Sequence, residues 1–201
     1  MDLMHQIAMG AGLAWASGIR LYAVLFLMGI LGHFGVIGLP PGLQVLAHPL
    51  VMSVSGGLCV LEFFADKIPG FDSVWDAIHT FIRIPAGAIL AAATFSDVDP
   101  ALMLAAGLLG GTIASGSHLT KAGSRALINT SPEPFSNWIA SFGEEAVVLG
   151  GVWTMLMHPA AFLALLVLFL GVAAWSLPKL WRGARALVQR VRNRMASGGA
   201  R

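Results

Sequence analysis

The longest apolar run of this sequence is AAFLALLVLFLGVAAW, from Ala160 to Trp175, and it contains no charged side chain. Such a run is typical of a helix in the hydrocarbon core of a membrane. Transmembrane β-barrels instead show shorter segments in which apolar and polar residues alternate, so the run favours helices. Charged residues make up 11% of the chain and its mean hydropathy is +0.78, whereas soluble domains contain about 25% charged residues. We therefore predict an all-α integral membrane protein.

Six apolar segments follow one another along the chain, separated by short stretches rich in Gly, Pro and Asp. The segments cover approximately residues 3–31, 50–66, 72–95, 101–127, 135–157 and 159–177. Because a bilayer-crossing helix needs about 20 residues, they predict a polytopic helical bundle of about six transmembrane helices. Pro85 is expected to kink or interrupt the third helix, since proline cannot donate a backbone hydrogen bond. We assign residues 1–178 to one transmembrane domain and residues 179–201 to a basic tail.

The basic tail holds seven of the twelve Lys and Arg residues of the chain and no acidic residue. Basic segments that flank membrane spans are retained in the cytoplasm, so the tail is predicted to be cytoplasmic. With six spans the N-terminus is predicted to be cytoplasmic too. The three connections that would then face outward, 32–48, 96–100 and 157–159, contain no Lys or Arg. We expect the tail to lie as an interfacial helix against anionic lipid of the bilayer and not to bind nucleic acid.

A short motif occurs twice, as ASGIRLY at residues 16–22 and in part as ASGSHLT at residues 114–120. Three spans separate the two copies, which would then cross the membrane in opposite directions. This is the pattern of a 3+3 inverted repeat, which in several transporter folds places the binding site at the repeat interface. The alternative is coincidence among abundant small residues. In either case the small residues let the first and fourth helices approach closely.

Polar residues at steps of three or four form one row along each of four predicted helices. The rows are Ser55, Cys59, Glu62 and Asp66; Asp72, Asp76, His79 and Arg83; Ser115, His118, Lys121 and Arg125; and Asn137, Ser141 and Glu144, with Glu145 adjacent. In the predicted topology all four rows lie in the cytoplasmic half of the membrane or at its inner surface. They predict a water-accessible cavity that opens to the cytoplasm.

Arg20 lies about sixteen residues into the first helix, near the middle of the membrane. An uncompensated charge at that depth costs at least about 2.5 kcal/mol. We therefore expect a carboxylate partner for Arg20, and Glu62, Glu144 and Glu145 are the candidates. The residues predicted to line a substrate or ion pathway are Arg20, Glu62, Asp66, Asp76, His79, Arg83, His118, Lys121, Arg125, Asn137, Glu144 and Glu145.

Two less specific interpretations of these charges stay open. Asp66, Lys67, Asp72 and Arg125 lie close enough to predicted helix ends that ordinary solvation also accounts for them. The charges of Arg20, Glu62 and Glu144 could instead form structural ion pairs that lock the helices together without any further role.

Two opposite ligand classes fit parts of the rows. Asp76 and His79 are three residues apart and could bind a divalent metal through oxygen and nitrogen, although Arg83 in the same row would repel a cation. Conversely, Arg20, Lys121 and Arg125 could hold a phosphate. The catalytic signatures HExxH and GxSxG and the phosphate loop GxxxxGK[ST] do not occur in the sequence.

The stretches ADKIPGFDSVWDAIHTFIRIPAGA and TKAGSRALINTSPEPFSN resemble an uncharacterised bacterial family of multi-pass membrane proteins, catalogued as domain of unknown function 4126. The resemblance covers nearly the whole chain apart from the basic tail. It implies a location in the bacterial inner membrane and transfers no activity and no residue roles.

The leading functional hypothesis is an inner-membrane transporter or permease-like protein for a small polar solute or ion. In it, Glu62, Glu144 and His79 serve as gating, proton-coupling or ligand groups. The second hypothesis is a metal-dependent enzyme acting on a lipid phosphate, with Asp76 and His79 as metal ligands and Lys121 and Arg125 holding the head group. The third is a structural or accessory membrane protein. The sequence leaves open whether copies of the chain associate into a homo-oligomer.

Overall fold

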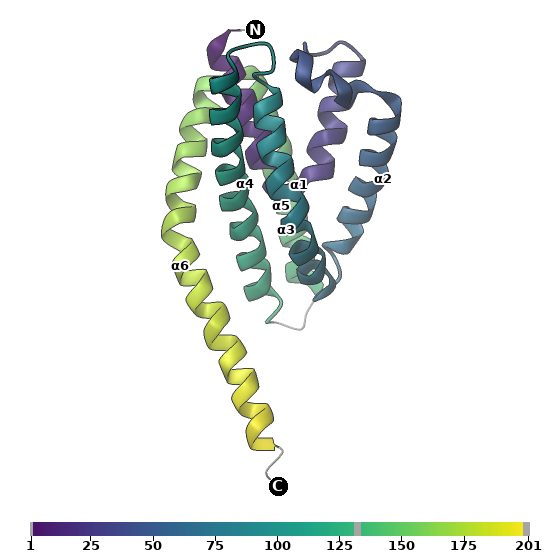
Figure 1. Ribbon diagram of the computed structural model, residues 1–201. Helices are drawn as coiled ribbons and strands as arrows, with labels where there is room; N and C mark the ends of the chain where they lie inside the picture. The colour runs from purple at the N-terminus through teal and green to yellow at the C-terminus, as the bar shows by residue number, and fades with distance from the viewer. Residues whose placement is uncertain (1, 131–133, 199–201) are drawn as a thin grey trace.

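A computed structural model describes residues 2–130 and 134–198, with side chains at 2–130, 135–179, Arg182 and Arg185. The described chain is all-α and forms one bundle of long helices (Figure 1). The helices are α1 (Leu3–His33), η1 (Pro41–Ala47, a 3-10 helix), α2 (Pro49–Ala65), α3 (Phe71–Ala93), α4 (Pro100–Ile128), α5 (Pro134–Met157) and α6 (Pro159–Gly198). Each of the six predicted segments therefore corresponds to one α-helix, and the predicted fold class is confirmed at this level.

Local residue chemistry explains where several helices begin. The side chain of Asp2 accepts a hydrogen bond from the His5 amide at 2.8 Å, and that of Asp99 accepts one from the Ala101 amide at 2.6 Å. These carboxylates satisfy first-turn amides that have no partner within the helix. Gly70 precedes α3 with a φ of +82°, a conformation that glycine adopts without strain. Pro85 lies inside α3 and does not divide it in two.

Four helices, α1, α4, α5 and α6, contain windows long and apolar enough to cross a membrane. The pair η1 and α2, bent by 68°, adds a fifth candidate if the pair is counted as one span. These candidates make the chain a multi-pass membrane protein by length and composition.

Helix α1 does not run straight from one end of the bundle to the other, because it turns back at Arg20. The backbone of Arg20 is non-helical, with φ −141° and ψ 73°. Before the turn, Gln6 donates to the carbonyl of Thr94. After it, the amide of Gly42, in η1, donates to the hydroxyl of Ser96. The chain before the turn and the chain after it therefore reach the same end of α3, and the two halves of α1 descend and rise again in Figure 1.

This turn changes the arrangement that six straight spans would give. The N-terminus lies at the end of the bundle opposite to the C-terminal part of α6 (Figure 1), whereas six straight spans would bring both termini to one end. The first half of α1 also runs in the same direction as α4, since Leu3 and Leu102 line one groove at the start of both helices and Gly18 meets Ser117 farther along. The two copies of the ASG motif are thus parallel neighbours, and not the opposed halves of an inverted repeat.

The close approach of α1 and α4 is confirmed. A Cβ atom on Gly18 would overlap the hydroxyl of Ser117 and lie 2.5 Å from the carbonyl of Ala114. On α3, a Cβ on Gly87 would likewise overlap Ala114. Because these residues are small, the backbones of three helices meet at the centre of the bundle, which is the packing mode typical of membrane helices.

Helix α6 continues through Pro178 to Gly198 and extends beyond the bundle (Figure 1). The prediction that this helix ends near Leu177 is therefore wrong. The residues that follow Pro178 include the good helix formers Lys, Leu, Arg and Ala, which favour continuation although one backbone hydrogen bond is lost. The side chains of the tail beyond Arg185, and so the predicted contact of most of its charges with lipid, lie outside the described residues.

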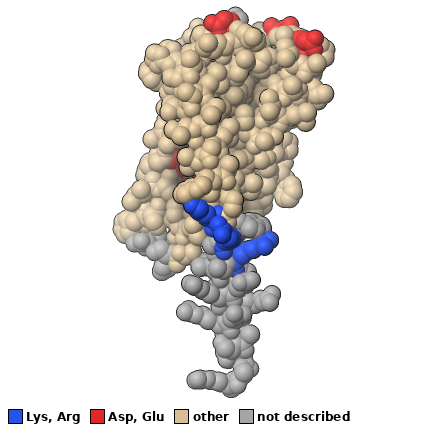
Figure 2. Space-filling view, turned by 90° about the vertical axis from the view of Figure 1, so that its left-hand side faces the viewer, with Lys and Arg blue, Asp and Glu red and all other residues tan. Residues whose placement is uncertain are grey.

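The surface charges are sorted between the two ends of the molecule (Figure 2). Asp2, Asp97 and Asp99 are exposed just before the first residues of α1 and α4, and Lys179, Arg182 and Arg185 are exposed on the C-terminal part of α6. Between them the visible surface is uncharged over most of its area, as expected for a surface that faces lipid.

Candidate functional site

All five Lys and Arg residues that precede the basic tail gather in one buried cluster with six carboxylates. This charged cluster consists of Arg20, Lys67, Arg83, Lys121, Arg125, Glu62, Asp66, Asp72, Asp76, Glu144 and Glu145. Its most accessible members are Glu144 and Glu145, whose side chains are 16% and 26% exposed. Helices α1 to α5 and the turn after α2 supply these residues, and none of them comes from the part of α6 that precedes the basic tail.

Asp66 is the centre of the charged cluster. Its Oδ2 lies 2.8 Å from the ammonium of Lys121, 3.2 Å from the guanidinium of Arg20 and 4.0 Å from that of Arg125. The side chain is fully buried, and three cations offset the large cost of holding a carboxylate away from water. Helices α1, α2 and α4 are thus joined through a single residue.

Arg125 is held by the geometry that guanidinium groups favour. Its Nε and Nη2 donate to the two oxygens of Glu144 at 2.8 and 3.0 Å. Its Nη1 donates to the carbonyl of Asp66 at 3.0 Å and to the carbonyl of Asn137 at 3.1 Å. Such two-point pairs fix orientation as well as distance, so Arg125 ties α5 to α4 and to the end of α2.

Arg83 bridges two further carboxylates on the other side of the cluster. Its Nη2 donates to Glu62 at 2.5 Å and its Nη1 donates to Asp76 at 2.7 Å. All three side chains are at most 2% exposed. Glu62 Oε2 and Asp76 Oδ2, the oxygens that do not face Arg83, are buried without a hydrogen-bond partner. Each carboxylate therefore has an acceptor that no protein group satisfies.

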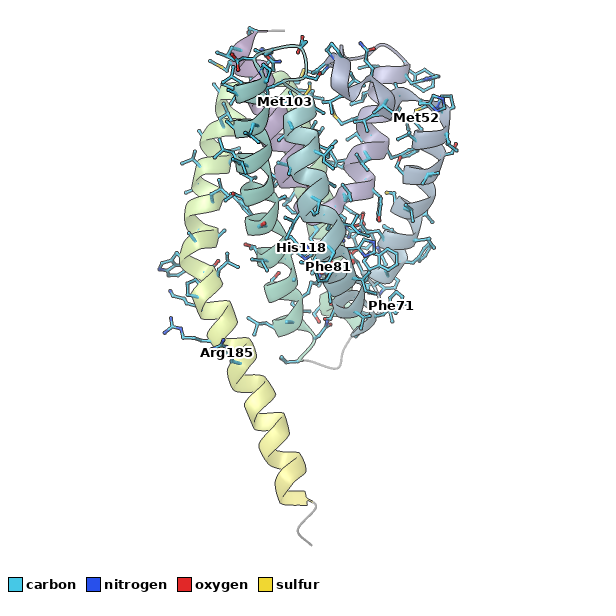
Figure 3. The ribbon with its side chains drawn as sticks, viewed as in Figure 1. Met52, Phe71, Phe81, Met103, His118 and Arg185 are labelled. Atoms are coloured by element: carbon cyan, nitrogen blue, oxygen red, sulfur yellow. The ribbon has the colours of Figure 1, made fainter. Side chains whose placement is uncertain are left out.

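The contacts of His118 favour one protonation state. Arg83 Nη1 lies 3.4 Å from His118 Nδ1, and because a guanidinium only donates, Nδ1 accepts. His118 Nε2 then carries the hydrogen and donates to the hydroxyl of Thr80 at 2.7 Å, while that hydroxyl donates to the carbonyl of Asp76. This pattern fits a neutral imidazole, which projects from α4 toward α3 (Figure 3).

His79 is bonded through both ring nitrogens as well. Its Nδ1 lies 2.8 Å from the carbonyl of Trp75 and its Nε2 lies 3.1 Å from the hydroxyl of Tyr22. The imidazole also stacks on the ring of Trp75, with 4.2 Å between centroids. Asp76 and His79 were expected to bind a metal together. Both nitrogens of His79 already have partners, and Asp76 pairs with Arg83. Among the described residues no group of three or more His, Cys, Asp or Glu side chains could hold a metal ion.

The turn of α1 brings backbone groups into the charged cluster. The ammonium of Lys121 donates to the carbonyl of Ile19 at 3.1 Å, and Arg20 donates to the carbonyl and hydroxyl of Ser141 at 3.2 and 2.8 Å. Irregular backbone at membrane depth is stable only where protein or water satisfies its polar groups. Lys121 of the charged cluster provides such a hydrogen bond at the break in α1, to the carbonyl of Ile19.

A groove of about 270 Å³ between α1, α2 and α5 reaches the charged cluster from the side. Its walls are mainly apolar, and Arg20 and Glu145 are its charged lining residues. Beside it, the ammonium of Lys67 lies 2.9 Å from the ring centroid of Phe63 on α2 and 4.6 Å from that of Phe142 on α5. Lys67 therefore closes the gap between these two helices at the level of the cluster.

The structure brings the twelve predicted pathway residues into this one region. The residues are Arg20, Glu62, Asp66, Asp76, His79, Arg83, His118, Lys121, Arg125, Asn137, Glu144 and Glu145. Of the three predicted partners of Arg20, Glu144 and Glu145 lie 3.6 and 3.4 Å away, whereas Glu62 pairs with Arg83 instead. The nearest carboxylate to Arg20 is that of Asp66, which was not among the three.

The interpretation of the helix-end charges as solvated is wrong. Asp66, Asp72 and Arg125 are fully buried and Lys67 is 8% exposed. These residues follow α2, begin α3 and end α4, and the three helix ends converge so that each side chain finds partners on another helix. Asp72, for example, accepts from Asn129 Nδ2 at 2.7 Å. Chain position near a helix end therefore did not imply exposure.

Several residues that belong to this region lay outside the predicted pathway set. They are Tyr22, Lys67, Asp72, Asn129 and Ser141. Ser141 already belonged to the polar row on α5. Counting the Lys and Arg residues along the sequence would have identified Lys67, because it is one of only five that precede the tail.

The sequence matches the family described as Domain of unknown function (DUF4126) over residues 7–179. This match covers α1 from residue 7 onward, α2 to α5, and α6 as far as residue 179. The chain belongs to this family. The family match thus includes the whole charged cluster and leaves most of the basic tail outside. No curated protein and no solved structure matches the chain.

Proposed function

We propose that this protein is a multi-pass membrane transporter of a small polar solute or ion, with the charged cluster as its substrate pathway. The observation that carries the proposal is the cluster itself, in which eleven ionisable side chains surround a break in an apolar helix. Replacing buried ion pairs by apolar residues is often neutral or stabilising. Packing alone therefore does not require so many buried charges, and ionisable groups at membrane depth favour a functional role.

The pairing pattern supports an exchange of partners during transport. Asp66 has three cations within 4.0 Å, and Arg20 has three carboxylates within 3.6 Å. A charged solute that pairs with one of these groups displaces an intramolecular partner, which still has others within reach. Two arrangements of similar free energy are the requirement for a ligand-driven conformational change.

We place the basic tail on the cytoplasmic side and the N-terminus on the opposite side of the inner membrane. The three connections without Lys or Arg then lie with the N-terminus, and the positive charges of the tail follow the usual retention in the cytoplasm. Glu144 and Glu145, the most accessible members of the cluster, are reached from the cytoplasmic half.

The experiment is a flux measurement in proteoliposomes that contain the purified full chain. Light scattering after mixing with potassium phosphate, potassium chloride or glycine reports net solute entry. We expect entry of at least one solute above that of protein-free liposomes, and its loss in Glu62→Gln. Asp97→Asn is the matched control, because Asp97 is an exposed acid outside the cluster. Flux that is unchanged in Glu62→Gln removes Glu62 from the pathway.

The dense pairing also supports a structural role as a second candidate. Arg125 alone is bonded to α5 and to the carbonyl that follows α2. If Glu62→Gln and Glu144→Gln lower thermal stability while no solute in the panel crosses the wild-type liposomes faster than protein-free ones, the structural role is favoured.

A further inference from the structure

The charged cluster contains one more carboxylate than it contains cations. Five basic side chains face six acidic ones among the described residues, and the contact of His118 Nδ1 with Arg83 fits a neutral imidazole. A net charge enclosed in a medium of low dielectric is costly, and proteins remove it by binding a proton or a counter-ion. The position of the extra negative charge can be found from the contacts of each carboxylate.

Four of the six carboxylates are stabilised in their ionised form by cations other than Arg83, by solvent or by a helix N-terminus. Asp66 has three cations around it, and Glu144 forms a two-point pair with Arg125. Glu145 is 26% exposed and lies 3.4 Å from Arg20. Asp72 lies in the first turn of α3, where its Oδ1 accepts from the Ser73 amide at 2.6 Å, and helix N-termini stabilise negative charge.

Glu62 and Asp76 remain, and they share Arg83. Arg83 is the sole cation within 4.0 Å of Glu62 among the described residues. Asp76 has Arg83 at 2.7 Å and Lys121 at 3.5 Å, but the Lys121 ammonium is closer to Asp66, at 2.8 Å. One guanidinium therefore faces two carboxylates that are both almost fully buried.

Other groups around the pair do not supply a second positive charge. Tyr22 on α1, Cys59 and Asp66 on α2, His79 on α3 and His118 on α4 are its remaining titratable neighbours. Arg20 is engaged by Asp66, Glu144 and Glu145, and Arg125 and Lys67 by Glu144 and Glu145. Both nitrogens of His79 have partners, whereas Glu62 Oε2 and Asp76 Oδ2 have none.

We propose that a proton is bound on the free oxygens of the Glu62 and Asp76 pair, so that the pair carries a single negative charge that Arg83 balances. Hydronium gives up the proton to one carboxylate oxygen, and water is released. The bound proton converts an unsatisfied acceptor into a hydroxyl donor. This inference deepens the proposed function, since it makes the proton the coupling ion if the protein transports a solute, but the binding itself does not depend on transport.

Infrared difference spectroscopy between neutral and alkaline pH tests the proposal on the full chain in nanodiscs. The wild type should show the C=O stretch of a buried carboxylic acid, shifted in D₂O. Glu62→Gln and Asp76→Asn should each abolish that band, because either amide removes one negative charge and leaves Arg83 with one ionised carboxylate. Asp97→Asn, which changes an exposed acid, should retain it.

Three results would overturn the proposal. The first is a wild-type spectrum without a carboxylic acid band, which needs no variant to fold. The second is a band that persists in both amide variants. The third is an imidazolium signal that disappears in His79→Gln, or stoichiometric binding of ²²Na⁺, together with ionised carboxylates. The spectra are recorded without a gradient, so absence of flux in proteoliposomes would reject the transport function and leave the proton site standing.

Discussion

Replacing Arg83 by methionine should destabilise the protein more than any replacement of a tail arginine. The guanidinium is fully buried and donates to Glu62 at 2.5 Å and to Asp76 at 2.7 Å. Methionine keeps much of the side-chain length and removes the charge, so the pair is left with a negative charge that nothing balances. Breaking a buried ion pair in this way costs about 3–5 kcal/mol.

Proton uptake sets an upper limit to this cost. Protonating one further glutamate with an ordinary pKa of about 4.3 at pH 7 costs about 4 kcal/mol. We therefore expect a loss of about 3–4 kcal/mol. For a chain of this size each kcal/mol lowers the melting temperature by about 2–4 °C, so Arg83→Met should melt about 6–16 °C below the wild type.

The assay is thermal unfolding of the detergent-solubilised chain, followed by the fluorescence of its six tryptophans. Arg182→Met is the matched control, because Arg182 is exposed on the tail, and surface replacements stay within about 0.5 kcal/mol. The triple variant Arg83→Met, Glu62→Gln, Asp76→Asn removes the guanidinium charge together with the negative charge of the pair and should recover most of the loss. If the triple variant melts as low as Arg83→Met, lost packing and not unbalanced charge is the cause, and the electrostatic reasoning is refuted.

Two further predictions concern the centre of the bundle and its orientation. Gly18→Ala should lower the stability by about 1–3 kcal/mol, because the new methyl group overlaps Ser117 Oγ. In the same melting assay Gly57→Ala should be neutral or slightly stabilising, since a Cβ atom on Gly57 meets nothing within 4 Å. Equal effects of the two variants would contradict the close packing of α1 against α4. In a Cys59→Ser background, cysteines at Asp2 and Arg182 should react with a membrane-impermeant maleimide from opposite sides of the membrane, and labelling of both from one side would contradict the turn of α1.

The helices and the polar rows were predictable because both depend on short-range geometry. An apolar stretch between Gly- and Pro-rich breaks forms a helix for local reasons, and residues three or four apart share a face whatever surrounds them. For this reason the bounds of α1 to α5 agree with the structure, and the polar rows on α2 to α5 converge in it. The same local reasoning failed at the end of α6, where good helix formers on both sides of Pro178 outweigh one missing hydrogen bond.

The turn at Arg20 could not be predicted in this way. The segment contains no proline, and its one neighbouring glycine, Gly18, is among 24 in the chain. Asp66, Ser141 and Lys121 hold Arg20 and the backbone beside it, and they come from three other helices.

The pairing of the charges was likewise decided by the tertiary structure. Periodicity placed Glu62 on one row and Arg83 on another, but which cation meets which carboxylate depends on how the helices converge. The sequence by itself determined an all-α membrane protein with a set of inward-facing charges. Only the folded bundle decided that α1 reverses, that the termini lie at opposite ends, and that one guanidinium serves two carboxylates, because these outcomes depend on contacts between residues far apart in the chain.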